Sequence, residues 1–276
     1  MTLQPSFATE PVTAHATRIL MPFGDCVYLV KGHDRAMLLD TGYGIGDLRA
    51  AVQNLTDGLE INVLLSHGHV DHVGGAAQFN HVYLNTADEP VAHRHGEVGF
   101  RLEFLTKTLP QQLAESGLER ADLVGPKPLP YDSVSDGDQF DLGGVTVVVH
   151  AVPGHTPGML VPVIVEDRVA VFGDACGENT LLCLPESLCV MEYAESLRKL
   201  RGYEDEWDIV VRNHGTHQSP TSILARNLEL AERILAGTDD MIQIQTPDGP
   251  ALMASVNHGP DVHGNIVYKV DDPRGF

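Results

Sequence analysis

The stretch His67-Gly68-His69-Val70-Asp71-His72 decides the fold, because it brings four potential metal ligands into six residues. The apolar run Ile61-Asn62-Val63-Leu64-Leu65 before it predicts a buried strand, and segment 73–79 after it predicts the start of a helix. A strand fixes the first side chains rigidly, and the helix start directs the later ones to a second point nearby. The stretch therefore predicts a metal site at the end of a strand.

The residue types in this stretch suit a metal centre. Neutral imidazole and carboxylate are ligands for zinc, and also for iron or manganese. His67 and His69 are two residues apart, so an extended backbone projects both side chains to the same side. Asp71 and His72 follow too closely to join that coordination sphere easily, which favours two metal ions over one. The alternative is a polar loop that is rich in histidine by chance, and the clustering of the histidines disfavours it.

The stretch resembles the HxHxDH signature of the metallo-β-lactamase fold superfamily. Further motifs of that family stand in the expected order, each at the end of a predicted strand. They are Met37-Leu38-Leu39-Asp40-Thr41-Gly42, Pro153-Gly154-His155-Thr156-Pro157-Gly158 after 145–149, Gly173-Asp174 after 169–172, and Asn213-His214-Gly215 after 209–211. The resemblance covers roughly residues 20–218. The ordered motifs make it specific for the superfamily, but not for one activity within it.

The resemblance implies an α/β fold, namely an αββα sandwich of two mixed β-sheets flanked by helices. It also implies two metal ions, most simply Zn²⁺, with Fe or Mn as alternatives. The ligands would be His67, His69 and His155 for one ion, Asp71, His72 and His214 for the other, and Asp174 as the bridge. Such ions lower the pKa of water so that hydroxide can attack a substrate at neutral pH. The second metal ion, or one of the catalytic candidates Asp71 and Asp174, would assist departure of the leaving group.

The chain of 276 residues has a formal net charge of −20. This charge repels phosphate backbones and anionic lipid, so neither nucleic acid nor a membrane is an expected partner. Residues 1–20 lack the basic start and apolar run of a secretory signal, and no stretch has the length and apolarity of a membrane helix. The cysteines form no CxxC pair, which favours a reducing compartment. We therefore expect a cytoplasmic protein that acts on a small molecule.

Residues 1–236 are predicted to form one catalytic domain, and residues 237–276 to extend the same domain with strands. A helical, cap-like segment at about 87–138 falls between the first two ligand blocks, although 122–138 reads as a loop. Other predicted helices are 46–56, 190–201 and 220–236; predicted strands are 19–30, 36–40, 61–65, 81–84, 145–150, 160–165, 168–173, 241–245 and 265–270. The last strand pair would join the sheet or a neighbouring subunit, which leaves a homodimer open.

Three features near the motifs have ordinary interpretations. His93 and His95 form a second HxH, but no DH follows, so the sequence favours a solvated helix face for both. Cys176 lies close to Asp174 in sequence, and a buried small residue is the favoured interpretation. Asp40 either orients a ligand imidazole or caps the turn that it forms with Thr41-Gly42.

Departures from individual families narrow the activity. Asp174 stands where the antibiotic-cleaving lactamases usually have Cys or Ser, which argues against lactam hydrolysis. Glyoxalase II-like thioesterases bring a basic glutathione-binding part, whereas the tail here carries only Lys269 and Arg274; acyl-homoserine lactonases have a Tyr soon after the bridging Asp, whereas Tyr193 is the first here. We predict a metal-dependent hydrolase of a small-molecule ester, lactone or thioester. Two alternatives are a mononuclear iron sulfur dioxygenase, similar to persulfide dioxygenases, and a phosphodiesterase.

Overall fold

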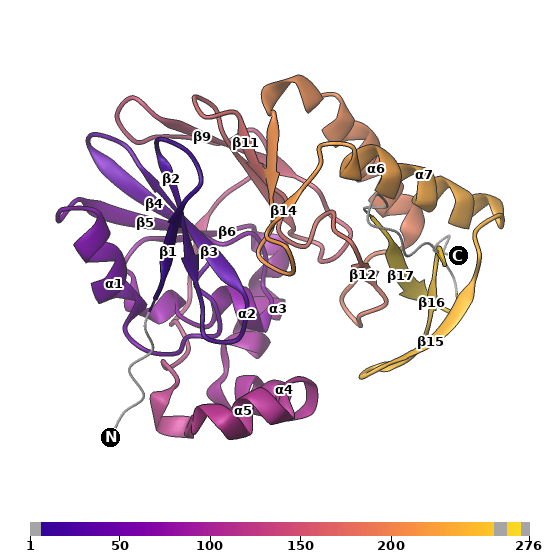
Figure 1. Ribbon diagram of the computed structural model, residues 1–276, viewed down its shortest axis with the longest axis horizontal. Helices are drawn as coiled ribbons and strands as arrows, with labels where there is room; N and C mark the ends of the chain where they lie inside the picture. The colour runs from indigo at the N-terminus through magenta and orange to yellow at the C-terminus, as the bar shows by residue number, and fades with distance from the viewer. Residues whose placement is uncertain (1–6, 257–263, 272–276) are drawn as a thin grey trace. The chain divides into compact units, whose positions relative to one another are not determined.

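The computed structural model describes residues 7–256 and 264–271. Arg274 lies outside the described residues. The chain divides into two compact units (Figure 1). Unit 1 comprises Met1–Val148 and Ile164–Asp167, and unit 2 comprises Val149–Val163 and Arg168–Phe276. Mixed parallel and antiparallel strands are flanked by helices, as the sequence predicts.

Unit 1 contains a mixed sheet with the strand order β1-β2-β3-β4-β5-β6-β7. Its strands are β1 (Thr9–Pro11), β2 (Ala16–Leu20), β3 (Cys26–Lys31), β4 (Arg35–Leu39), β5 (Glu60–Leu64), β6 (Val82–Leu84) and β7 (Asp132–Ser133). From β4 onward the pairing is parallel, and Leu39 is in register with Leu64. Because parallel strands end at the same edge, the residues after β4, β5 and β6 lie close together. Beside this sheet, β8 (Gln139–Asp141) pairs with the first half of β9 (Thr146–Ala151).

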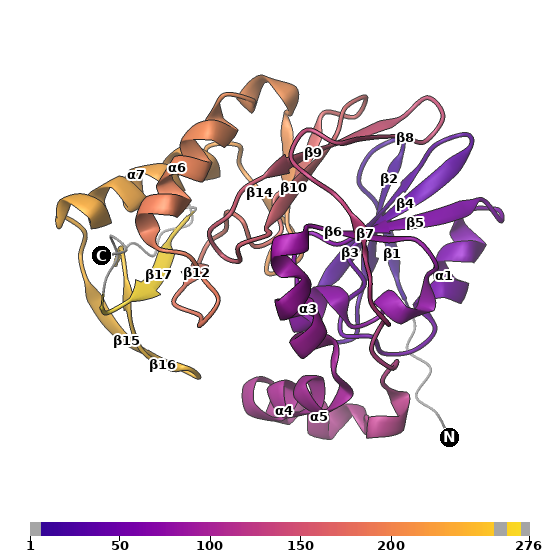
Figure 2. The same cartoon turned by 180° about the vertical axis from the view of Figure 1, so that it is seen from behind.

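The helices of unit 1 are α1 (Leu48–Leu55), α2 (Val70–Val73), α3 (Glu89–Gly96), α4 (Val98–Thr108) and α5 (Pro110–Ser116). Figure 2 shows α4 and α5 lying together next to the end of α3. One apolar core lies against the main sheet, and a second one, around Tyr43, Val70 and Leu105, holds α4 and α5. The predicted helical segment therefore has its own core, which includes a residue of the ligand-rich stretch.

Arg101 ties α4 to that stretch. The side chain is completely buried, and its Nη1 donates to the carbonyl oxygens of Tyr43 at 2.8 Å and Gly74 at 3.1 Å. Its Nη2 donates to the carbonyl oxygen of Val124. Burial lowers the pKa of Arg101 to about 10, so the guanidinium stays charged at neutral pH and keeps these donors. Three chain segments are fixed to one side chain as a result.

Unit 2 contains two strand groups and two long helices. The first group has the order β14-β13-β11-β10, and the second has the order β12-β17-β16-β15. The strands are β10 (Leu160–Ile164), β11 (Val169–Val171), β12 (Thr180–Leu182), β13 (Ile209–Val211), β14 (Gln218–Ser219), β15 (Ile242–Thr246), β16 (Gly249–Met253) and β17 (Ile266–Lys269). Helices α6 (Val190–Arg201) and α7 (Ile223–Ala236) lie side by side in both views (Figures 1 and 2), and one core joins them to the strands. Within the described residues, no helix is both long and apolar enough to cross a bilayer.

Two predicted elements differ from the structure, and some observed strands were not predicted. The strand expected at 19–30 is two strands, since a turn around Gly24, where φ is +91°, separates β2 from β3. The helix expected after His72 is α2 alone, which ends before Gly74 and Gly75 and is followed by a single 3-10 turn at Ala76–Gln78. Strand β16 is one of the strands that the sequence did not predict, because it begins with Gly249 and Pro250.

Candidate metal centre

Unit 1 brings the side chains of the ligand-rich stretch together. His67 Nε2 and His69 Nδ1 are 3.0 Å apart, and the rings of His67 and His72 have centroids 4.0 Å apart. His72 Nε2 lies 3.7 Å from Asp71 Oδ2. The three imidazoles are buried, whereas Asp71 is half-buried. Strand β5 and the short helix α2 thus gather four donor groups at one end of the sheet.

Asp40 fixes the positions of Ser66 and His72 through its carboxylate. Its Oδ1 accepts a hydrogen bond from the Ser66 amide at 2.7 Å, and its Oδ2 accepts one from Ser66 Oγ at 2.9 Å. The same Oδ2 lies 2.9 Å from His72 Nδ1, which directs the other nitrogen of that ring away from Asp40. The φ of Asp40 is +67°, and its side chain is fully buried. Of the two interpretations of Asp40, the contacts support the one in which it orients a ligand imidazole.

Gly68 lets the stretch lie directly on the start of α3. Its amide donates to Asp88 Oδ2 at 2.8 Å. A Cβ at this position would lie 2.7 Å from the Ala92 nitrogen and 2.9 Å from the Asp88 carbonyl oxygen, closer than real Cβ contacts. Only glycine fits between His67 and His69, so α3 sets the position of both histidines.

Unit 2 places two predicted ligand imidazoles beside one predicted ligand carboxylate, Asp174. Asp174 follows β11; its Oδ2 lies 3.5 Å from His155 Nε2, and its Oδ1 lies 3.5 Å from His214 Nε2. His155 Nδ1 is 2.8 Å from the Leu181 carbonyl oxygen, which fixes the ring so that Nε2 faces Asp174. The backbone of the His155 turn is held by Ser187 Oγ, which donates to the His155 carbonyl oxygen at 2.9 Å.

The donor sets in both units fit metal ions. Two ligand nitrogens on one tetrahedral zinc ion are roughly 3.3 Å apart, because each Zn–N bond is about 2.0–2.1 Å. The separation of 3.0 Å between His67 Nε2 and His69 Nδ1 is close to this value. A carboxylate with an imidazole nitrogen near each oxygen, as at Asp174, has the form of a bridging ligand. Outer partners on His72 and His155 are also typical of metal-binding imidazoles.

The expectation for His95 was wrong. Its side chain is buried, and its ring stacks on His69 with centroids 5.0 Å apart and on Phe100 with centroids 4.2 Å apart. His93 is exposed, as expected. Helical periodicity explains the difference. His95 lies three residues after Ala92 and therefore shares its buried face, whereas His93 lies two residues before His95 and therefore points to the opposite side of the helix. The apolar pair Val91-Ala92 was the signal that could have revealed this buried face.

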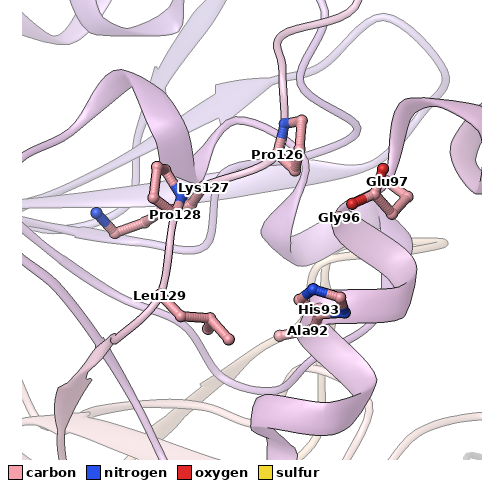
Figure 3. A pocket seen from close by; sticks show the side chains of 8 residues that line it. All are labelled: Ala92, His93, Gly96, Glu97, Pro126, Lys127, Pro128 and Leu129. Carbon is pink, nitrogen blue, oxygen red and sulfur yellow. The ribbon is translucent and has the colours of Figure 1, made fainter.

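The expected cap segment also lines a pocket of about 360 Å³ on the His93 face of α3 (Figure 3). Its lining residues are Ala92, His93, Gly96, Glu97, Pro126, Lys127, Pro128 and Leu129. None of the predicted ligands lines this pocket. It is therefore distinct from the gathering of imidazoles around His67.

Cys176 is buried next to α7, and its Sγ donates to the Ile223 carbonyl oxygen at 3.5 Å. Burial raises the pKa of the Cys176 thiol to about 12, so the thiol is neutral at physiological pH. Because a thiolate is the form that binds metal, this result agrees with the expected structural role.

A family model for the metallo-beta-lactamase superfamily matches residues 23–214, which include every predicted ligand. The chain belongs to this superfamily. The fold agrees: a metallo-beta-lactamase from Pontibacter korlensis superposes with a TM-score of 0.60 at 15% identity, over 82% of this chain and 99% of that one. The expected fold class is therefore confirmed, and so is the expectation of an enzyme at the level of the superfamily.

Curated relatives carry several activities. An atrochrysone carboxyl ACP thioesterase from Aspergillus fumigatus is 25% identical over 65% of this chain and 37% of its own length. A hydroxyacylglutathione hydrolase, GloC, from Haemophilus influenzae is 29% identical over 54% of this chain and 65% of its own. An acyl-coenzyme A thioesterase, MBLAC2, from Gallus gallus is 26% identical over 63% of this chain and 65% of its own. The chain thus spans less than two thirds of the length of these relatives.

Proposed function

We propose that this protein is a metal-dependent hydrolase of small acyl thioesters, with esters and lactones as chemically close alternatives. The two ligand groups would form one dinuclear centre. His67, His69 and His155 would hold one ion, Asp71, His72 and His214 would hold the other, and Asp174 would bridge them. Zinc is the proposed metal, and iron or manganese would suit the same donors.

The observation that carries the proposal is the position of Asp174. One of its oxygens faces His155 and the other faces His214, each at 3.5 Å. Both separations exceed the roughly 2.7–3.2 Å of an ordinary hydrogen bond, as expected if an ion lies between the carboxylate and each imidazole. Two ions at close range repel strongly, and a bridging anion offsets that repulsion. Asp174 has the charge and the two-sided environment for this role.

Divalent ions at the site would supply Lewis-acid chemistry, namely a nucleophile from water at neutral pH and polarisation of a carbonyl oxygen. The chain's own residues keep the ligands in place. Asp40 accepts from His72 Nδ1, and the Leu181 carbonyl does the same for His155, so each ring offers Nε2. Asp71 is half-buried, and we propose that its carboxylate also assists the leaving group. Such prearranged geometry removes reorganisation from the reaction.

Relatives named as thioesterases favour thioesters within this class. Asp174 argues against lactams, because the lactamases usually have Cys or Ser at this position. The tail offers Lys269 within the described residues, and its Nζ donates to the Ser187 carbonyl oxygen. This lysine therefore has a structural contact, and we do not expect glutathione recognition to depend on it. The preferred substrate is an acyl thioester of another carrier.

The state of the cysteines is consistent with an enzyme of a reducing compartment. The four cysteines Cys26, Cys176, Cys183 and Cys189 are free thiols. We propose the cytoplasm as the compartment, since such thiols persist there without pairing. The edge strand β15, which is one strand of the predicted pair, is the proposed contact in a homodimer.

Two measurements test the proposed function. Protein purified without added metal should contain about two zinc ions per chain and should hydrolyse a panel of acyl thioesters, esters and lactones. Asp174→Asn should lower kcat/KM and metal content together, whereas the exposed Asp208→Asn should change neither. About one iron per chain, with oxygen uptake that depends on a persulfide, would instead support the dioxygenase. No turnover of any panel member by the metal-loaded protein would contradict the hydrolase.

A further inference from the structure

A row of aromatic side chains runs through unit 1 and begins at a predicted metal ligand. His69 stacks on His95, with ring centroids 5.0 Å apart and planes 20° apart. His95 stacks in turn on Phe100, with centroids 4.2 Å apart and planes 27° apart. Phe104 lies one turn after Phe100 on the same side of α4, because residues four apart are neighbours on a helix surface. The predicted ligand His69 is thus linked through His95 to the aromatic side chains of α4.

The row continues beyond α4 into the loops next to the sheet. Phe104 lies near Tyr43, with centroids 6.3 Å apart, and Tyr43 meets Phe23 edge-to-face at 5.9 Å. Phe23 belongs to the turn between β2 and β3, and Tyr43 follows the Asp40 segment. We call the set His69, His95, Phe100, Phe104, Tyr43 and Phe23 the aromatic row.

The row is only partly covered by the protein. His95 and Tyr43 are buried, but Phe23, Phe100 and Phe104 are half-buried. They pack against the core that contains Val70, a residue of the ligand-rich stretch itself. Each of these three rings therefore keeps part of its apolar surface open to a ligand. The charged residues of α4, such as Glu103 and Lys107, are exposed elsewhere on the helix.

We propose that the aromatic row binds an apolar acyl group of the substrate. The inference rests on the proposed hydrolase function, because it places the acyl chain along the row while the carbonyl carbon lies by the metal ligands. The proposal also restricts the substrates to those with long apolar acyl groups, because a short polar acyl group would not contact Phe104 and Phe23. An apolar acyl chain that packs on these rings is removed from water, so each added methylene group strengthens binding.

Hydrolysis of N-acetylcysteamine thioesters, from acetyl to dodecanoyl, tests the inference. We expect kcat/KM of the wild-type protein to rise about two- to fourfold with each added methylene until the row is covered. Phe23→Ser and Phe104→Ser should flatten this dependence. Leu113→Ser is the matched control, because Leu113 packs half-buried against the same core without belonging to the row. It should keep the chain-length dependence of the wild type.

A binding measurement separates this inference from the proposed function. The dodecyl and ethyl thioethers of N-acetylcysteamine cannot be hydrolysed, and calorimetry gives their affinity for the protein. We expect the dodecyl compound to bind at least about tenfold more tightly, and Phe23→Ser, which changes a turn, to remove this preference. Equal affinity of the two thioethers, or a preference that both row variants keep, would overturn the inference even if the protein hydrolyses thioesters. A preference that the row variants lose would support it even if no thioester is turned over.

Discussion

The carboxylate of Asp40 and its positive φ together fix the orientation of the His72 ring. Asp40→Asn is the appropriate substitution, since asparagine also tolerates a positive φ and leaves the backbone unstrained. The amide cannot accept from Ser66 and His72 as the carboxylate does, so we expect metal affinity to fall roughly 10–100-fold. Chelator competition measures this. Asp47→Asn, at the exposed N-cap of α1, is the control and should leave metal affinity unchanged. Unchanged affinity in Asp40→Asn would show that Asp40 only supports the turn.

His95 gives a second prediction, because it touches His69 without being one of the predicted ligands. Stacked rings contribute about 0.5–1.5 kcal/mol beyond burial, so His95→Ala should weaken metal binding about two- to tenfold. His95→Phe should restore most of the affinity, since it keeps a flat ring between His69 and Phe100. His93→Ala removes an exposed histidine from the same helix and is the control. Failure of the phenylalanine variant to rescue would point to a polar role for His95.

The sequence could single out candidate ligands, but it could not single out the residues that surround them. The ligands within His67–His72 are adjacent, so their spacing alone brings their side chains together. Asp40 could not be assigned, because its role depends on parallel pairing of β4 with β5, which places it beside Ser66. His95 was misjudged because its neighbour His69 comes from a different element, and packing between elements is not visible in a local pattern.

Contact between the ligand-rich stretch and helix α3 supplies a prediction at the scale of elements. Gly68→Ala would place a Cβ 2.7 Å from the Ala92 nitrogen, so either the stretch or α3 must move. We expect a loss of about 1–3 kcal/mol in the free energy of unfolding, typical of overpacking, together with weaker metal binding. Gly99→Ala, in α4, is the matched control. Its Cβ would meet only Arg120 Nη1, at 3.8 Å, and it should stabilise the helix slightly. Urea denaturation with and without a chelator compares them; equal stability of the two variants would contradict this account.

Elements with a clear apolar pattern were predictable, including the short strands β6, β11 and β13, whereas short elements without such a pattern were not. Helix α6 was predicted with its observed ends, because apolar residues recur at helical spacing over its whole length. Helix α2 ends after four residues, since Gly74 and Gly75 follow it and pack against the Tyr43 and Thr41 backbone. Strand β16 pairs on both sides although Pro250 lies in it, so its neighbours, not its own composition, stabilise it.

At the scale of the whole molecule, the predicted ligands divide between the two units. Unit 1 supplies His67, His69, Asp71 and His72, and unit 2 supplies His155, Asp174 and His214. Within each unit, a neighbouring oxygen atom orients a ligand imidazole: Asp40 orients His72, and the Leu181 carbonyl orients His155. The proposed centre would take ligands from both units, and a metal that binds only the folded protein stabilises it in proportion to the logarithm of its concentration.

A double-mutant cycle tests this coupling. If His69 and His155 hold the same ion, either alanine substitution should weaken that site more than the roughly 10–100-fold expected for loss of an outer partner. The double variant should then cost little more than the worse single variant, because the shared ion is already lost. His150 supplies the control, since it belongs to unit 2 but hydrogen-bonds Glu206 at 2.7 Å. The effects of His69→Ala and His150→Ala on metal affinity should simply add. Additive losses for His69 and His155 would mean that the two units bind metal independently, and the dinuclear proposal would fail.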